Sequence, residues 1–163
     1  MTKRKVRGEN AVLTVRSRLE FEQDSPEWSE LNTKAQYQYH GETASIVYTD
    51  LDELGEPIGE TEVTVTGLRS GSLIVTIHKT GFTETLMILE PGKTHPVSYE
   101  TMLGSFRMQL HTINIRAFFT EKKGEIILRY SMNLGNSASN VNTVIMRVTM
   151  QAPTVQAVQH RLS

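Results

Sequence analysis

Two tyrosines and a threonine on alternating apolar segments are the side chains best placed for ligand chemistry. Tyr99 and Thr101 keep the parity of Val97, and Tyr130 keeps the parity of Leu128. Residues two apart in a β-strand share a face, so these hydroxyls face inward wherever Val97 and Leu128 do. A buried hydroxyl needs a hydrogen-bond partner, which either the protein or a ligand supplies. If the protein supplies the partner, these side chains belong to internal packing. If a ligand supplies it, they line a ligand cavity at one end of a barrel.

Cationic and imidazole side chains near these positions would suit an enzyme. Arg107 and Arg129 stand on the opposite parity, which predicts the solvent face, and His111 lies between them in the sequence. An active site would need such groups gathered in one pocket with shifted pKa values. Their dispersal over the solvent face would remove the enzyme interpretation.

An acidic segment over residues 50–60 begins like a calcium-binding loop. The spacing D-x-D-x-L-G runs from Asp50 to Gly55. Such a loop needs an oxygen ligand at its fifth position and a bidentate carboxylate at its twelfth. Leu54 and Thr61 stand there instead, and the flanking segments alternate as strands. The pattern therefore favours a solvated hairpin loop without a metal.

Other catalytic and cofactor motifs are missing from the sequence. The five histidines are scattered and form no H-E-x-x-H pair, so a zinc site would have to assemble from distant strands. No G-x-S-x-G nucleophile elbow occurs, and no glycine-rich phosphate loop precedes a helix. We therefore expect no cofactor and no metal, and catalysis is the weakest functional hypothesis.

The distribution of charge argues against nucleic acid as a partner. The net charge is −1, so no overall basic field would attract phosphates. A short basic arm over residues 3–7 favours a solvated tail over phosphate contacts. Tyr37 and Tyr39 could stack bases, but their alternation with polar residues favours a place inside a barrel.

The composition indicates one domain in a reducing compartment. The chain has 163 residues, enough for one core, and no cysteine, which excludes disulfides and thiolate metal sites. The basic N-terminus lacks the apolar run of a secretory signal, and no segment is long enough to span a bilayer. We expect a soluble cytoplasmic protein with no membrane partner.

Period-two alternation dominates the chain and predicts its fold class. Segments such as residues 13–21 and 126–134 alternate apolar and polar residues between turns rich in glycine and proline. About ten short strands result, and a meander of this length protects its edges best by closing. We predict an all-β, antiparallel, up-and-down β-barrel of about eight to ten strands. It should span residues 11–151, between a basic arm at 1–10 and a loose tail at 152–163.

One segment has two interpretations. Residues 106–110 alternate as a strand, whereas residues 113–119 continue on the opposite parity. An extra residue near His111 or Thr112 would restore the pattern, as a β-bulge does. The alternative is a helix over residues 103–117, whose apolar side chains also match helical spacing. The β-rich surroundings favour the bulged strand.

Five spaced motifs follow one another along the chain. They are Tyr48-x-Asp50, Lys79-x-Gly81 before Leu86-Met87, Tyr99-x-Thr101-x-x-Gly104-x-Phe106, Thr112, and Gly124 leading to Leu128-x-Tyr130. Together they resemble the YwiB-like bacterial proteins, a family of unknown function, over about residues 12–150. Lys79 stands where that family more often has arginine, and Met102-Leu103 where it often has Pro-Tyr. The resemblance implies a calycin-like (lipocalin-like) barrel in the bacterial cytoplasm, and it implies no activity.

The alternation and the resemblance together define the candidate ligand-binding residues. These are Tyr37, Tyr48, Tyr99, Thr101, Thr112 and Tyr130. The leading hypothesis is a β-barrel that binds a small, partly apolar ligand in or at its mouth. The alternative is a non-catalytic interaction module or homodimer, with Trp28 as a candidate contact. An enzyme of unknown type is the third hypothesis.

Overall fold

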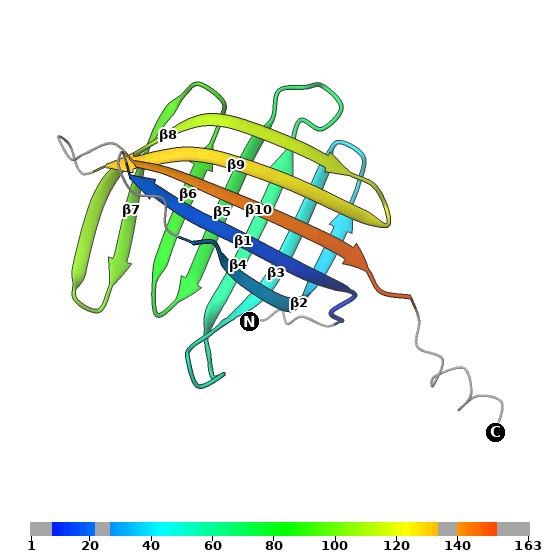
Figure 1. The fold of residues 1–163 in the computed structure, drawn as a ribbon, viewed down its shortest axis with the longest axis horizontal. Helices are drawn as coiled ribbons and strands as arrows, with labels where there is room; N and C mark the ends of the chain where they lie inside the picture. The colour runs from blue at the N-terminus through cyan, green and yellow to red at the C-terminus, as the bar shows by residue number, and fades with distance from the viewer. Residues whose placement is uncertain (1–7, 22–26, 134–139, 153–163) are drawn as a thin grey trace.

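The computed structural model describes residues 8–21, 27–133 and 140–152, which form ten β-strands. They are β1 (Ala11–Phe21), β2 (Ser29–Tyr39), β3 (Thr43–Leu51), β4 (Pro57–Thr66), β5 (Ile74–Gly81), β6 (Glu84–Leu89), β7 (Thr94–Thr101), β8 (Gly104–Phe119), β9 (Lys123–Asn133) and β10 (Asn140–Met150). The strands close into one antiparallel barrel in sequence order, with β1 beside β10 (Figure 1). The predicted fold class is thereby confirmed. Residues 1–7 of the predicted arm and 153–163 of the predicted tail lie outside the described residues.

The up-and-down order gives the barrel two distinct ends. Strands β1, β3, β5, β7 and β9 run toward one end, at the left and lower left of Figure 1, which we call the mouth. The other five strands run toward the opposite end, which we call the packed end. The described part of the chain contains no helix that is long and apolar enough to cross a membrane.

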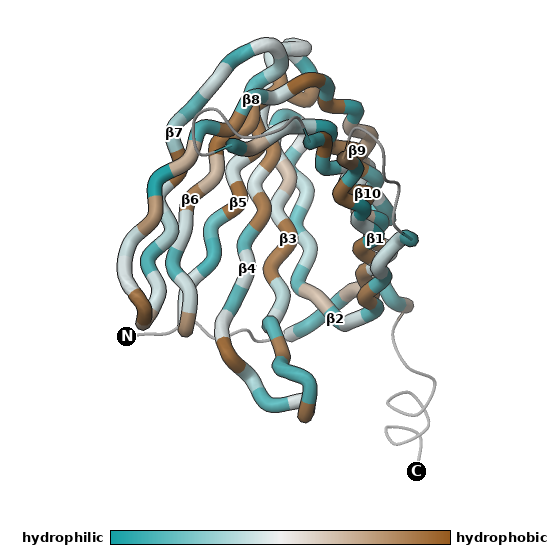
Figure 2. The backbone as a smooth tube through the Cα atoms, turned by 60° about the vertical axis from the view of Figure 1, so that its left-hand side comes forward, coloured by the Kyte–Doolittle hydropathy of each residue, from teal (hydrophilic) through white to brown (hydrophobic). Residues whose placement is uncertain are grey.

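The inward side chains are buried at the packed end and become accessible toward the mouth. Figure 2 shows apolar and polar residues alternating along the strands, as the period of two requires. On β1, Ala11 and Leu13 are 0% and 1% exposed. Leu19 and Phe21 belong to the same face of that strand but are 38% and 45% exposed. The core therefore occupies one part of the barrel and leaves the other part more open.

A β-bulge in β8 resolves the ambiguous segment. The 16-residue strand pairs with β9, and its register shifts between Thr112 and Asn114, so Ile113 is the extra residue. The shift keeps apolar side chains inside the barrel, because Leu110 and Ile115 are both buried despite their opposite parity. The helix alternative is wrong, since β7 and β9 pair with this segment on its two sides.

The acidic hairpin between β3 and β4 is tighter than predicted. β3 continues to Leu51 and β4 begins at Pro57, so only residues 52–56 form the turn. Asp52 Oδ1 accepts the backbone N–H groups of Leu54 at 2.8 Å and Glu56 at 2.9 Å. Aspartate commonly closes turns in this way. The carboxylate of Asp52 thus has a structural role in the turn.

Candidate functional site

Three adjacent strands carry a polar cluster on the inner wall near the mouth. Tyr48 of β3 lies opposite Thr61 of β4, and Thr61 lies opposite Lys79 of β5. Asp50 follows Tyr48 on the same face of β3. Thr61 Oγ1 donates to Asp50 Oδ2 at 2.7 Å and accepts from Lys79 Nζ at 2.8 Å. We call Tyr48, Asp50, Thr61 and Lys79 the polar cluster.

The polar cluster combines one pair of opposite charges with buried neutral groups. Thr61 is fully buried, whereas the side chains of Lys79 and Asp50 are 36% and 24% exposed and 3.8 Å apart. Burial, helped by the charge of Asp50, raises the pKa of Tyr48 to about 12, while a hydrogen bond with Thr61 opposes the shift. Tyr48 is therefore neutral at physiological pH, and the charges of Lys79 and Asp50 balance each other.

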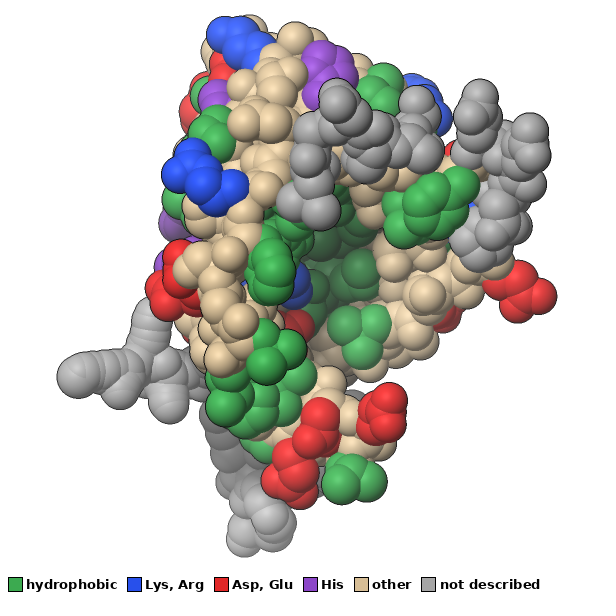
Figure 3. All heavy atoms as spheres, turned by 90° about the vertical axis from the view of Figure 1, so that its left-hand side faces the viewer, with side chains coloured by type: hydrophobic (Ala, Val, Ile, Leu, Met, Phe, Trp, Pro, Cys, Tyr) green, Lys and Arg blue, Asp and Glu red, His purple; other side chains and the backbone are tan. Residues whose placement is uncertain are grey.

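A pocket of about 270 Å³ borders the polar cluster at the mouth. It is lined by Asp50, Leu51, Ile58, Lys79, Thr80, Phe82 and Thr83. Figure 3 views this side of the molecule and shows a hollow whose walls are mainly apolar, with charged side chains of both signs inside it. A mainly apolar hollow with a few polar groups is the usual composition of a small-molecule site.

Two further tyrosines project inward from β7 and β9. Tyr130 is 8% exposed, and Tyr99 is half-buried against the core. Burial raises the pKa of Tyr99, and it raises the pKa of Tyr130 to about 12 with a further contribution from Tyr99. Neither hydroxyl makes a hydrogen bond to another described residue. These two neutral hydroxyls are thus available to a bound molecule.

Tyr37 lies at the packed end, away from the mouth. Its hydroxyl donates to the backbone carbonyl of Thr120, and its ring centroid lies 6.1 Å from that of Phe119. Burial raises its pKa to about 12, so it remains a donor over the physiological range. Tyr37 thus closes one end of the barrel with its polar atom already engaged.

Thr101 and Thr112 also use their hydroxyls within the protein. Thr101 Oγ1 donates to the carbonyl of Gly104 at 3.0 Å, within the hairpin between β7 and β8. Thr112 is fully buried, and its Oγ1 accepts the backbone N–H of Glu90 at 3.2 Å. Of the six candidate residues, Tyr48, Tyr99 and Tyr130 therefore lie on the inner wall toward the mouth. The other three, Tyr37, Thr101 and Thr112, use their hydroxyls for hydrogen bonds within the protein.

The sequence pattern predicts Tyr48 as a site residue but not the other members of the polar cluster. It assigns Asp50 to a solvated loop, whereas the structure places Asp50 on the inward face of β3. A signal exists in the alternation, because Asp50 and Lys79 each follow a buried residue, Tyr48 and Ile77, by two positions. A charge on the apolar face of a strand is the informative exception in such a pattern.

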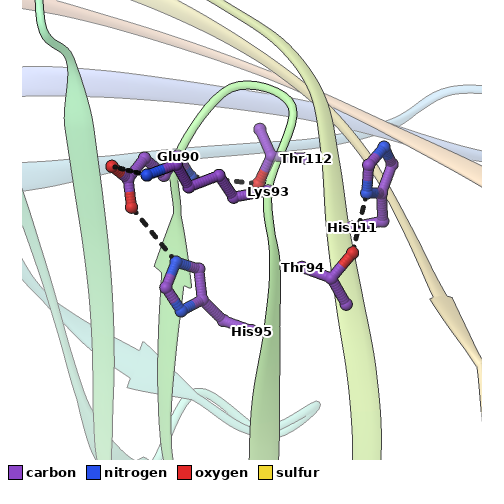
Figure 4. A network of polar contacts seen from close by, with 6 residues as sticks. All are labelled: Glu90, Lys93, Thr94, His95, His111 and Thr112. Carbon is purple, nitrogen blue, oxygen red and sulfur yellow. Dashed lines mark hydrogen bonds and ion pairs between the residues drawn. The ribbon is translucent and has the colours of Figure 1, made fainter.

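A second polar network lies at the turn between β6 and β7, at the packed end (Figure 4). Glu90 Oε1 lies 3.2 Å from His95 Nε2, and Glu90 Oε2 lies 3.4 Å from Lys93 Nζ. The hydrogen bond with His95 is the largest cause of a lowered pKa at Glu90. His111 Nδ1 pairs with Thr94 Oγ1 at 2.9 Å on the neighbouring strands. Among the described residues, no group of three or more histidines or carboxylates is placed to hold a metal.

Trp28 and the arginines lie on the outside of the barrel. The guanidinium groups of Arg16 and Arg18 both stack on the Trp28 ring, with Cζ atoms 4.9 Å and 4.7 Å from ring centroids. This stacking covers part of the indole and joins it to β1. Arg107 is exposed, and Arg129 alternates with buried residues of β9. The cationic groups considered for an enzyme therefore do not gather with the inward tyrosines.

Comparisons with known proteins identify the family. The family described as "Domain of unknown function (DUF1934)" matches residues 13–146. The crystal structure of the ywiB protein from Bacillus subtilis is similar, with a TM-score of 0.71 and 19% sequence identity over 88% of this chain and 93% of that chain. No curated protein matches. The resemblance to the YwiB-like proteins is thereby confirmed, and the chain belongs to the family of the domain of unknown function DUF1934.

Proposed function

We propose that this barrel binds a small, partly apolar molecule inside its mouth. The observation that carries the proposal is the change along the inward face of β1. Exposure on that face rises from 0% at Ala11 to 45% at Phe21. Apolar side chains that point inward but remain accessible border space that the protein does not fill. Removal of this apolar surface from water would favour binding.

The neighbouring strands complete the walls of the proposed site. Leu31 of β2 and Phe106 of β8 lie on the inward faces of their strands and are 42% and 50% exposed. The hydroxyls of Tyr99 and Tyr130, together with the polar cluster, give a bound molecule a few fixed polar contacts. Calycin-like barrels, which the sequence resembles, bind small apolar ligands inside the barrel, and this analogy supports the proposal. The lack of cysteine and the bacterial relative favour a bacterial cytoplasmic setting.

A dye-binding assay with two matched variants tests the proposal. N-phenyl-1-naphthylamine, which fluoresces in apolar surroundings, should bind the wild-type protein. Val15→Phe enlarges a half-buried inward side chain, whereas Val12→Phe makes the same change on the outer face, where Val12 is 41% exposed. We expect Val15→Phe to weaken dye binding roughly tenfold, which corresponds to about 1.4 kcal/mol. Val12→Phe should leave the dye affinity unchanged.

The result that would refute the proposal is an equal dye affinity in both variants, or no dye binding by the wild type. Circular dichroism spectra of both variants establish that the barrel is intact. Native mass spectrometry of protein purified without refolding provides a second test. A co-purifying small molecule that is lost on denaturation would support ligand binding and give the mass of the ligand.

An interaction module is the second candidate function, and the hairpin tips at the mouth favour it. Leu54, Met102 and Leu103 are 86%, 89% and 93% exposed. Apolar side chains at such tips are typical of surfaces that bury themselves against a partner, including a second copy of the chain. Light scattering tests this candidate. A dimer that dissociates on Met102→Ser with Leu103→Ser would support it, and a wild-type monomer would count against a homodimer.

A further inference from the structure

We propose that the polar group of the ligand is uncharged and presents a hydrogen-bond acceptor to Lys79 and a donor to Asp50, as a primary amide does. This inference rests on the proposed ligand-binding function and specifies the class of ligand. The amide oxygen would accept from the ammonium group, and the amide N–H would donate to the carboxylate. The polar cluster has unused hydrogen-bonding capacity and a balance of charge, and both favour such a group.

Lys79 has donor capacity that the barrel does not use. An ammonium group carries three N–H donors. One reaches Thr61 Oγ1 at 2.8 Å, whereas Asp50 Oδ1 is 3.8 Å from Nζ, beyond hydrogen-bond distance. The side chain is 36% exposed and lines the pocket at the mouth. A ligand in that pocket can therefore reach the remaining donors.

Asp50 has acceptor capacity in the same place. Its Oδ2 accepts from Thr61, and its Oδ1 accepts no hydrogen bond within the described part of the chain. Thr61 is fully buried and bonds to both charged side chains, so it holds them in a fixed relation. An unused donor and an unused acceptor thus lie side by side, with Thr61 as their positioning residue.

The charges that line the pocket decide which polar group fits. Among the described residues that line the pocket, Asp50 and Lys79 are the only charged ones. An anionic ligand would be attracted by Lys79 but repelled by Asp50, and a cationic ligand would meet the reverse. An uncharged donor–acceptor group bonds to both side chains and leaves no unpaired charge in a partly buried site. The apolar side chains of Ile58 and Phe82 favour an alkyl chain attached to that group.

Three eight-carbon competitors that differ in their end group test the inference. Octanamide, octanoate and octylamine are each titrated against wild-type protein loaded with the naphthylamine dye. At pH 7 the amide is neutral, the acid is anionic and the amine is cationic. We expect octanamide to displace the dye at a concentration roughly tenfold below that of either ion, on the order of one good hydrogen bond.

Two variants of the charged pair separate recognition from structure. Asp50→Asn removes the repulsion of anions, so octanoate should become the strongest competitor. Lys79→Met removes the repulsion of cations, so octylamine should become the strongest. A merely structural role would weaken all three competitors by the same factor and leave their order unchanged. The wild-type ranking needs no variant, so it decides the question even if a variant fails to fold.

The outcomes distinguish this inference from the proposed function. If the dye does not bind the wild type, or binds equally after Val15→Phe and Val12→Phe, ligand binding in the mouth is refuted. If the dye binds there but octanoate or octylamine competes best, or all three compete equally, ligand binding stands and the amide-like class is overturned. Octanamide as the strongest wild-type competitor, with opposite changes of preference in the two variants, supports the proposal.

Discussion

The packed end and the mouth of the barrel share the same ten strands, but their inward side chains differ in kind. At the packed end, Tyr37 and Phe119 lie close together, and the Phe119 ring covers Gly124 on the paired strand. At the mouth, the inward series ends in Asp50 and Lys79 and in apolar side chains that remain accessible. The inward side chains of the packed end are buried, whereas the mouth holds a mainly apolar hollow with charged side chains inside it (Figure 3).

This difference teaches that stability and recognition can be divided along the axis of one barrel. An apolar side chain stabilises a fold in proportion to the surface that it removes from water. The packed end therefore supplies most of the stability available from burial, whereas mouth residues such as Leu19 leave part of their surface exposed. Substitutions at the mouth should change binding more than folding, and those at the packed end should do the reverse.

Leu13→Ala and Leu19→Ala compare the two ends on one strand and have the largest expected difference. Leu13 is 1% exposed, whereas Leu19 is 38% exposed. We expect Leu13→Ala to lower the free energy of unfolding by about 2–5 kcal/mol, because it leaves a cavity in the core. Leu19→Ala should cost less than about 1 kcal/mol. Urea denaturation followed by Trp28 fluorescence measures both, and equal losses would contradict the division between the ends.

Gly124→Ala tests how closely the packed end fits together. A Cβ at position 124 would lie 2.0 Å from Cδ1 of Phe119, so the ring would have to move. We expect a loss of about 1–3 kcal/mol, as overpacking usually costs. The same substitution in a Phe119→Ala background should cost much less, because the clash is gone. Additive losses in the double variant would show that this contact does not constrain the packed end.

Tyr37→Phe and Tyr130→Phe remove the same atom from the two regions. The Tyr37 hydroxyl donates to the Thr120 carbonyl, whereas the Tyr130 hydroxyl makes no hydrogen bond to another described residue. We expect Tyr37→Phe to cost about 1 kcal/mol of stability. Tyr130→Phe should change stability by less than about 0.5 kcal/mol. Urea midpoints measure both changes in stability. A larger loss of stability in Tyr130→Phe than in Tyr37→Phe would contradict a structural role for the Tyr37 hydroxyl and an unengaged Tyr130 hydroxyl.

Glu90→Gln tests the network at the packed end through its dependence on pH and has the smallest expected effect. The pKa of Glu90 is lowered from its usual range, chiefly by the hydrogen bond with His95. A carboxyl with a depressed folded-state pKa adds stability above its unfolded-state pKa, and loses it as the pH falls through the folded value. Wild type should therefore exceed Glu90→Gln in stability at pH 7 and lose that advantage in acid. Urea midpoints at several pH values measure this, and a pH-independent difference would exclude the ionised carboxylate as its source.

Much of the fold follows from the sequence because a period of two constrains every strand. The alternation identifies which face of a strand is buried, and the change of parity between Leu110 and Ile115 predicts the bulge that the structure has at Ile113. The extent of the acidic hairpin could not be read in this way. Polar residues there belong both to a turn and to the wet face of strands, which look alike in composition.

The candidate site is only partly predictable because parity gives the face of a residue and not its depth. Tyr37 and Tyr130 have the same inward signal, yet Tyr37 bonds to Thr120 at the packed end while Tyr130 keeps its hydroxyl unengaged. Depth depends on the register between strands, and alternation within one strand carries no information about it. The row that joins Tyr48, Thr61 and Lys79 exists only after three strands have paired.

The pairing of β1 with β10 has a consequence for the making of the protein. These strands match along their whole length, from Ala11 opposite Met150 to Phe21 opposite Asn140. A ribosome synthesises β1 first among the strands and β10 last, so the barrel cannot close while most of the chain is emerging. During that interval one edge of β1 lacks its partner, and an unpaired edge recruits strands from other chains. Because recruitment between chains depends on their concentration, weak expression should yield more closed barrel, and strong overexpression should yield more aggregate.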